Sequence, residues 1–139
     1  MKYLSLKVKL MLRHVEKYFS MDHDFDFQSD SIFFYMTEDY EYKRSLRLDK
    51  DIILDFNKNN IPVAMEILHA SKRLKIDKVN LKDLMGLNMN IEVGKDHIHI
   101  KAAFNIIIRN KSKPLEFKAE GENSINLPST ETNFATADI

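Results

Sequence analysis

His97 and His99 are the residues whose type and spacing come nearest to a metal site in this chain. They alternate with Ile98 and Ile100, so on a strand both imidazoles project from one face. A metal site needs at least a third ligand, and the sequence does not indicate which side chain would supply it. We therefore predict no metal, catalytic or cofactor-binding residue, and we keep a metal-dependent hydrolase using His97 and His99 as an alternative.

Acidic residues gather before the first strong strand pattern, at Asp22, Asp24, Asp26 and Asp30. Their spacing resembles a calcium-binding loop, but Phe27 and Phe33 stand where such a loop requires glycine and glutamate. Aspartates in this position typically cap turns or face water. We interpret the cluster in that way.

A second acidic group consists of Asp51, Asp55 and Glu66, which a predicted hairpin would place on one face of a sheet. Paired carboxylates can perform acid–base chemistry or bind magnesium. Arg47 and Lys50 are close in sequence and would neutralise them, so we favour a salt-bridged surface over a catalytic pair.

The segment Lys72–Lys82 is the most basic part of the chain. No aromatic residue lies among its lysines to stack on bases, and the whole chain has 21 basic and 21 acidic residues. A neutral protein does not concentrate nucleic acid around itself. Weak nucleic-acid binding through this segment remains a second alternative, which the overall charge disfavours.

The pattern of apolar residues along the chain predicts an α+β protein, in which an antiparallel, meander-rich sheet packs against two helices. Residues 4–19 show the apolar stripe of an amphipathic helix with a basic opposite face, although Leu4 to Leu10 also alternate as in a strand. Residues 68–87 are expected to be helical in one or two pieces, with Asp77 or Asn80 as the cap of a second piece. The length of 139 residues suits a single domain. Pro114 is expected to interrupt the C-terminal strands, and residues 128–139 form an extension. Strands are expected over residues 32–36, 44–48, 51–56, 61–68, 89–93, 98–108 and 115–119.

Localisation and membrane contact follow from composition. The chain has no cysteine, which suits a reducing compartment. Its apolar runs stay far below the roughly 20 residues that span a bilayer, and lysines interrupt the N-terminus where a signal peptide would be apolar. We expect a cytoplasmic protein without membrane contact.

The run from Ala102 to Ile108 is apolar on both faces of its predicted strand, apart from Asn105. Such a strand needs cover on two sides, which a subunit interface can supply. We predict a homo-oligomer, most simply a symmetric dimer. The predicted interface residues are Phe104, Ile106, Ile107 and Ile108.

Residues 25–74 resemble the DUF2283 family of small, functionally uncharacterised bacterial and archaeal proteins. The residues that carry the resemblance are an aspartate-rich lead into Ser31-Ile32-Phe33, then residues 52–56 (Ile-Ile-Leu-Asp-Phe), Glu66-Ile67-Leu68 and Ala70-Ser71. The longer form with a β-rich C-terminal half is similar to archaeal members. The resemblance implies a small sheet packed on a helix, no known enzymatic activity, and a protein partner.

Overall fold

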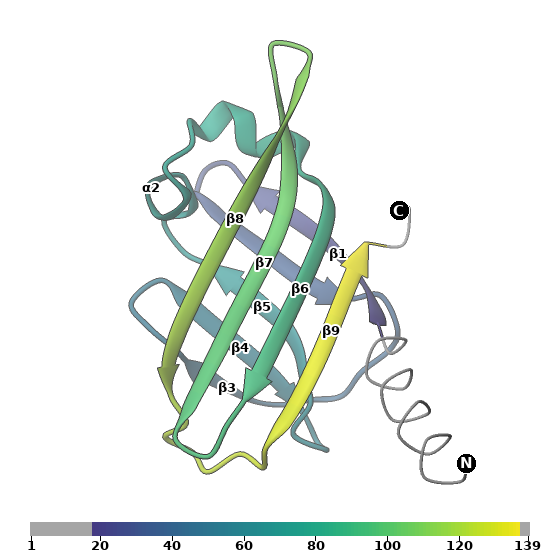
Figure 1. Ribbon diagram of the computed structural model, residues 1–139, viewed down its shortest axis with the longest axis vertical. Helices are drawn as coiled ribbons and strands as arrows, with labels where there is room; N and C mark the ends of the chain where they lie inside the picture. Colours follow the sequence, from purple (N-terminus) through teal and green to yellow (C-terminus); the bar gives the residue numbers. More distant parts are fainter. Residues whose placement is uncertain (1–17, 137–139) are drawn as a thin grey trace, which may run out of the picture.

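The computed structural model describes residues 18–136, which form nine strands and two short helical segments (Figure 1). The strands and helical segments, in chain order, are β1 (Tyr18–Asp26), β2 (Ser31–Met36), β3 (Tyr42–Arg47), β4 (Ile52–Asn57), β5 (Pro62–Ile67), α2 (Ala70–Leu74), η1 (Lys78–Asp83), β6 (Met85–Val93), β7 (His97–Ile108), β8 (Lys111–Glu122) and β9 (Thr130–Thr136).

The predicted α+β class is wrong, because 61% of the described residues are in strands and only 9% are helical. The predicted central helix over 68–87 is replaced by α2, η1 and the start of β6. His69 and Lys75 have left-handed backbones, with φ of 52° and 57°, and they limit α2 to five residues. Most of the predicted helix over 4–19 lies outside the described residues, but Tyr18 and Phe19 belong to β1.

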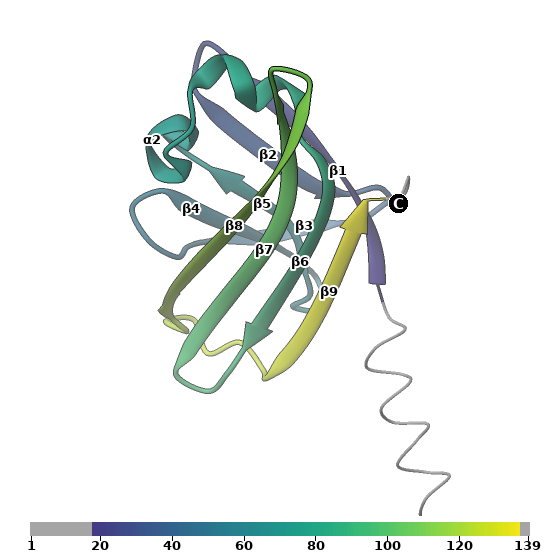
Figure 2. The same ribbon diagram turned by 45° about the horizontal axis from the view of Figure 1, so that its top comes forward.

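All nine strands belong to one sheet, in the order β3-β4-β5-β2-β1-β9-β6-β7-β8. Only β1 and β9 pair in parallel among these strands, and every other neighbouring pair is antiparallel. The sheet curls so strongly that β2 to β5 form one layer and β6 to β9 form a second, with strands that run in crossing directions (Figure 2). Each layer therefore covers the apolar face of the other.

The predicted hairpin of β4 and β5 is confirmed, and Leu54 lies opposite Met65 in its register. Asn57 builds the connection, since its side-chain oxygen accepts hydrogen bonds from the backbone N–H groups of Asn59 and Ile61 at 2.9 and 3.0 Å. A register shift after Asp55 keeps the core face continuous. Alternation predicts one apolar face of this hairpin, formed by Ile52, Leu54, Phe56, Ile61, Val63, Met65 and Ile67. All of these residues are buried except Ile61, which is half-buried.

The core lies between the two layers. Phe34 of β2 and Phe104 of β7 meet across it, with ring centroids 6.4 Å apart. Both rings are almost completely buried. This contact joins the N-terminal half of the chain to its C-terminal half, so neither layer has a separate core.

The C-terminal strands extend further than the alternation of the sequence suggests. Pro114, expected to interrupt the pattern, lies within β8. It is tolerated because β8 is the last strand in the sheet order, where a missing N–H need not break a ladder. The predicted C-terminal extension contributes β9, which pairs with both β1 and β6.

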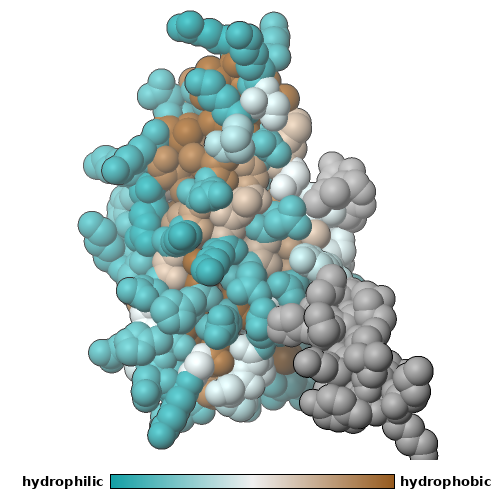
Figure 3. Space-filling view, viewed as in Figure 1, coloured by the Kyte–Doolittle hydropathy of each residue, from teal (hydrophilic) through white to brown (hydrophobic). Residues whose placement is uncertain are grey.

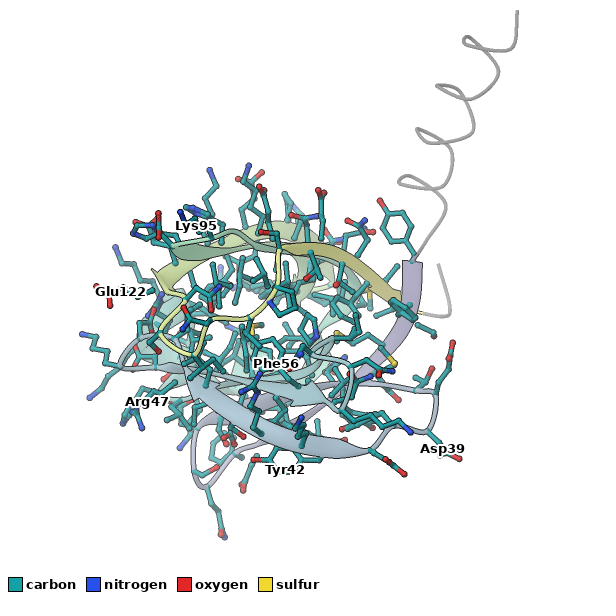
Figure 4. All side chains as sticks on the ribbon, turned by 90° about the horizontal axis from the view of Figure 1, so that it is seen from below. Asp39, Tyr42, Arg47, Phe56, Lys95 and Glu122 are labelled. Carbon is teal, nitrogen blue, oxygen red and sulfur yellow. The ribbon has the colours of Figure 1, made fainter. Side chains whose placement is uncertain are left out.

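The two ends of the sheet meet where the turn after β3 touches β8. A Cβ atom added to Gly121 would overlap the carbonyl oxygen of Leu48 and lie 2.7 Å from Cδ1 of its side chain. Viewed from below, Arg47 at the end of β3 and Glu122 at the end of β8 lie on the same side of the molecule (Figure 4). We call this contact between Leu48 and Gly121 the seam.

We expect Gly121→Ala to destabilise the protein, because the added methyl group must push the Leu48 backbone away from β8. The free energy of unfolding should fall by about 1–3 kcal/mol, the usual cost of overpacking. Denaturant unfolding followed by circular dichroism measures it. Glu122→Ala, an exposed change on the same strand, is the control and should shift stability by less than about 0.5 kcal/mol. Equal stability of both variants would contradict a closed seam.

Candidate functional site

The densest group of interacting polar side chains in the described residues joins the turn before β4 to α2. Asp51 is 6% exposed, and its two oxygens contact Nδ1 of His69 at 3.1 Å and a guanidinium nitrogen of Arg73 at 3.2 Å. The other guanidinium nitrogen of Arg73 donates to Asp49 at 2.8 Å. We call these four residues the Asp51 cluster.

The backbone places the cluster. Asp49 accepts the N–H groups of Asp51 and Ile52 at 2.8 and 3.0 Å, which forms the turn into β4. His69 stands at the N-terminal end of α2 with a left-handed backbone and makes no side-chain cap there. Its ring is therefore left to contact Asp51.

The cap that His69 does not provide comes from a distant turn. The carboxylate of Asp30 accepts the backbone N–H of Ser71 at 3.0 Å and its hydroxyl at 2.6 Å. The carbonyl of Asp30 accepts the N–H of Ala70 at 2.8 Å. Asp30 thus satisfies two of the donors at the start of α2, as an N-cap residue normally does.

The charges of the cluster are balanced internally. Burial alone would raise the pKa of Asp51, but hydrogen bonds from His69 and Arg73, together with the positive charge of Arg73, hold this pKa below its usual range. The pKa of Arg73 is raised, mainly by its hydrogen bond to Asp49. Asp51 is therefore a carboxylate at neutral pH, held by two donors.

The chemistry open to this cluster is limited. A carboxylate at Nδ1 orients an imidazole and leaves Nε2 as the acceptor of the neutral ring, which is the arrangement of a general base. The hydroxyl of Ser71 donates its hydrogen to Asp30 rather than to His69, as part of the cap of α2. Arg73 donates one hydrogen bond to each of two carboxylates. The geometry fits a structural fastening better than a catalytic pair.

Beside the cluster runs a groove of about 440 Å³ along β8. Asp49 and Arg73 form one side of it, and Lys101 and Lys118 form part of the other. The guanidinium of Arg73 also lies over the ring of Phe117, 5.3 Å from its centroid. The cluster therefore holds α2 against the edge of the C-terminal layer, next to the seam.

His97 and His99 lie on the outer face of β7, as the alternation predicted, and both are exposed. The register sets Glu122 opposite His97 and Glu120 opposite His99, whose Nδ1 is 3.3 Å from the Glu120 carboxylate. Among residues 18–136, no group of three or more His, Cys, Asp or Glu residues is arranged to hold a metal ion.

The acidic residues divide in a way that the sequence did not indicate. Asp55 and Glu66 share the outer face of β4 and β5, where Glu66 pairs with Ile53. Asp51 leaves that group, because it precedes β4 and turns to His69 and Arg73. The expected three-carboxylate surface is therefore not formed.

The basic segment Lys72–Lys82 has a contact that sequence reasoning missed. The ammonium groups of Lys78 and Lys82 lie 4.6 and 4.8 Å from the ring centroid of Phe27, which comes from the β1–β2 turn. Arg73 is bound within the Asp51 cluster. Part of the basic charge is therefore held by the protein itself.

The predicted interface residues separate into two pairs. Phe104 and Ile106 are 3% and 1% exposed and belong to the core. Ile107 and Ile108 are half-buried. The side chains of Phe104 and Ile106 are therefore buried by other residues of the same chain.

Comparison with known proteins gives a family match and two relatives. The family model for DUF2283, a protein of unknown function, matches residues 23–71. A Methanosarcina mazei protein named "putative hypoxanthine phosphoribosyltransferase" is 39% identical over 106 residues, covering 76% of this chain and 85% of that protein. An uncharacterised Methanocaldococcus jannaschii protein is 34% identical over 105 residues, covering 75% and 89%. No solved structure matches.

We expect Asp51→Asn to weaken the protein at neutral pH by about 2 kcal/mol, because Arg73 and His69 lose a charged partner. The folded-state pKa of Asp51 is depressed, so its contribution is present above the unfolded value near 3.8 and is lost as pH falls through the folded value. Unfolding at pH 7 and at pH 3 measures both effects, and the difference between wild type and variant should shrink at pH 3. Asp24→Asn, an exposed carboxylate on β1, should change neither. A variant as stable as wild type at pH 7 would contradict this role.

Proposed function

Because this chain belongs to the DUF2283 family of proteins of unknown function, we propose that it is a non-enzymatic protein that acts through contact with another protein chain. The partner is a second copy, and the contact surface is the outer end of the β7–β8 hairpin. The observation that carries the proposal is an apolar hairpin end that its own core covers only in part.

The hairpin of β7 and β8 rises beyond the rest of the molecule (Figure 1). Its turn is formed by Arg109 and Asn110, both with positive φ, which is the backbone of a tight two-residue hairpin turn. Just before it, Ile107 and Ile108 point to opposite faces of the strand. Both are half-buried, so hydrophobic surface remains on each side of the hairpin end.

Apolar side chains continue from this end across the outer face of the C-terminal layer. Hydrophobic surface gathers over the upper part of β7 and β8 (Figure 3). Ala103 and Pro114 are exposed there, and Met85 of β6, opposite Asn105 in the register, is 41% exposed. An apolar patch on one face, rimmed by lysine and glutamate, is typical of a protein contact surface.

Pairing through the sheet edge is disfavoured. The edge strand β8 carries Pro114 and the exposed lysines Lys111 and Lys113, which are features that oppose edge pairing. Further along, Leu48 lies against the backbone of Gly121. The two copies therefore meet by face packing of their hairpin ends.

We do not propose for this chain the phosphoribosyltransferase activity that the name of the Methanosarcina relative states. Phosphoribosyl transfer requires a site that holds a pyrophosphate group, which proteins commonly build from a glycine-rich loop at the N-terminus of a helix. The chain has three glycines, and the helical segments among residues 18–136 have five and six residues.

Among the described residues, none of the helices has the length and hydrophobicity of a membrane span.

At about 10 µM the protein should sediment as a dimer, and Ile107→Glu should weaken the dimer by about tenfold or more in Kd, because a charge would be buried at the centre of the contact. Analytical ultracentrifugation across a concentration series measures this. Tyr42→Glu is the matched control, since Tyr42 is 59% exposed and lies in β3, in the other layer of the sheet. A monomeric wild type, or equal effects of both substitutions, would refute the proposed dimer.

The absence of enzymatic activity has its own test. Incubation of the protein with hypoxanthine, phosphoribosyl diphosphate and Mg²⁺ should release no pyrophosphate above a protein-free control. Release that grows in proportion to protein concentration, accompanied by formation of the nucleotide, would overturn the non-enzymatic assignment.

A further inference from the structure

A second uncovered surface lies at the other end of the molecule from the β7–β8 hairpin turn. A groove of about 420 Å³ opens between the start of β1, the loop from β2 to β3 and the β4–β5 turn. Its apolar side chains are Phe19, Met36, Tyr40 and Ile61, of which Phe19, Tyr40 and Ile61 are half-buried. We call it the acidic groove, after its rim.

The rim carries more negative than positive charge. Glu38, Asp39 and Glu41 line the groove and are exposed. The one basic residue in its lining is Lys58, which lies 3.7 Å from Glu41. A partner for this groove therefore needs apolar side chains for the floor and positive charge for the rim.

Residues 1–17 of the chain have both properties. They lie outside the described residues, and their sequence holds five basic residues and one acidic residue. The five basic residues are Lys2, Lys7, Lys9, Arg13 and Lys17. Val8, Met11, Leu12 and Val15 are apolar positions at helical spacing within this segment.

The position of the groove also favours this segment. The described chain begins at Tyr18, and the next residue, Phe19, is part of the groove wall. In the view from below, the labelled Asp39 lies on the side of the molecule where β1 begins (Figure 4). A tethered segment that starts beside its site has an effective concentration in the millimolar range.

We infer that residues 8–17 of the same chain dock in the acidic groove. The floor formed by Phe19, Tyr40 and Ile61 offers burial to apolar side chains, and the acidic rim complements the positive charge of this segment. The proposal does not depend on the dimer through the hairpin end, which lies elsewhere on the molecule.

The test uses the full-length protein and exploits the absence of cysteine. A variant with Leu12→Cys and Lys58→Cys, treated with a short bismaleimide, should cross-link within one chain, because Lys58 lines the groove. The matched control joins Leu12→Cys with Lys95→Cys. Lys95 is exposed and lies on the opposite side of the molecule (Figure 4), so this pair should react at least about tenfold more slowly if the segment is held in the groove.

Reversing the charges of the rim distinguishes cross-linking of a docked segment from cross-linking through random encounters. Adding Glu38→Lys, Asp39→Lys and Glu41→Lys to the first pair should slow cross-linking by about fivefold, and added salt should slow the unreversed pair in the same way. Circular dichroism confirms that each variant is folded. Equal rates for the Lys58 and Lys95 pairs would overturn the proposal. Cross-linking rates that do not change when the rim charges are reversed would also overturn it. Cross-links that form only between chains would overturn it too, and they would assign the groove to a second copy.

Discussion

The packing of the turn after β3 against β8 is the contact on which the closed form of this protein depends. A curled sheet buries its inner face only if its two ends approach each other, and here they do so where Leu48 lies on Gly121. Arg73 reinforces the same place, since its guanidinium binds Asp49 and Asp51 and covers Phe117. The core between the layers, including the pair of Phe34 and Phe104, is sealed on that side by these few residues.

The family-matched region, residues 23–71, supplies Leu48, Asp49 and Asp51 to this contact, while Arg73 lies just beyond it. It contains the strands of one layer and the residues that fix the start of α2, with Asp30 capping Ser71 and Asp51 contacting His69. The C-terminal half supplies the second layer and the strand that the fastening holds. The polar residues of the matched region therefore have a structural role that does not require a substrate.

A sheet that closes on itself at one side still leaves its other extremities uncovered. The hairpin of β7 and β8 extends past the layer that would cover it, and the acidic groove opens where the chain enters β1. Both are surfaces at which burial of apolar side chains is incomplete. The mixed charge around the hairpin end suits a second copy, while the acidic rim of the groove suits the basic N-terminal segment.

The strands with a strong period of two could be predicted from the amino-acid sequence alone. Alternation from Ile52 to Ile67 indicated the buried face of the β4–β5 hairpin, because successive side chains point to opposite faces of a strand. It did not give the pairing, since Phe56 lies opposite Pro62 rather than Ile61. It also identified the outer-face position of His97 and His99. These features depend on residues that are neighbours along the chain or across one turn.

The remaining features depend on contacts between segments that are distant in the sequence. The spacing of apolar residues over 68–87 favours a helix, but left-handed residues and the pairing of β6 with β7 and β9 divide this segment. The Asp51 cluster could not be predicted, since Asp51 and Arg73 are 22 positions apart and no local pattern turns Asp51 away from the sheet. The seam joins Leu48 to Gly121, which lies 73 positions further along the chain. Such contacts form because burying the apolar inner faces of the two layers stabilises the protein more than the local conformational preferences of the backbone do.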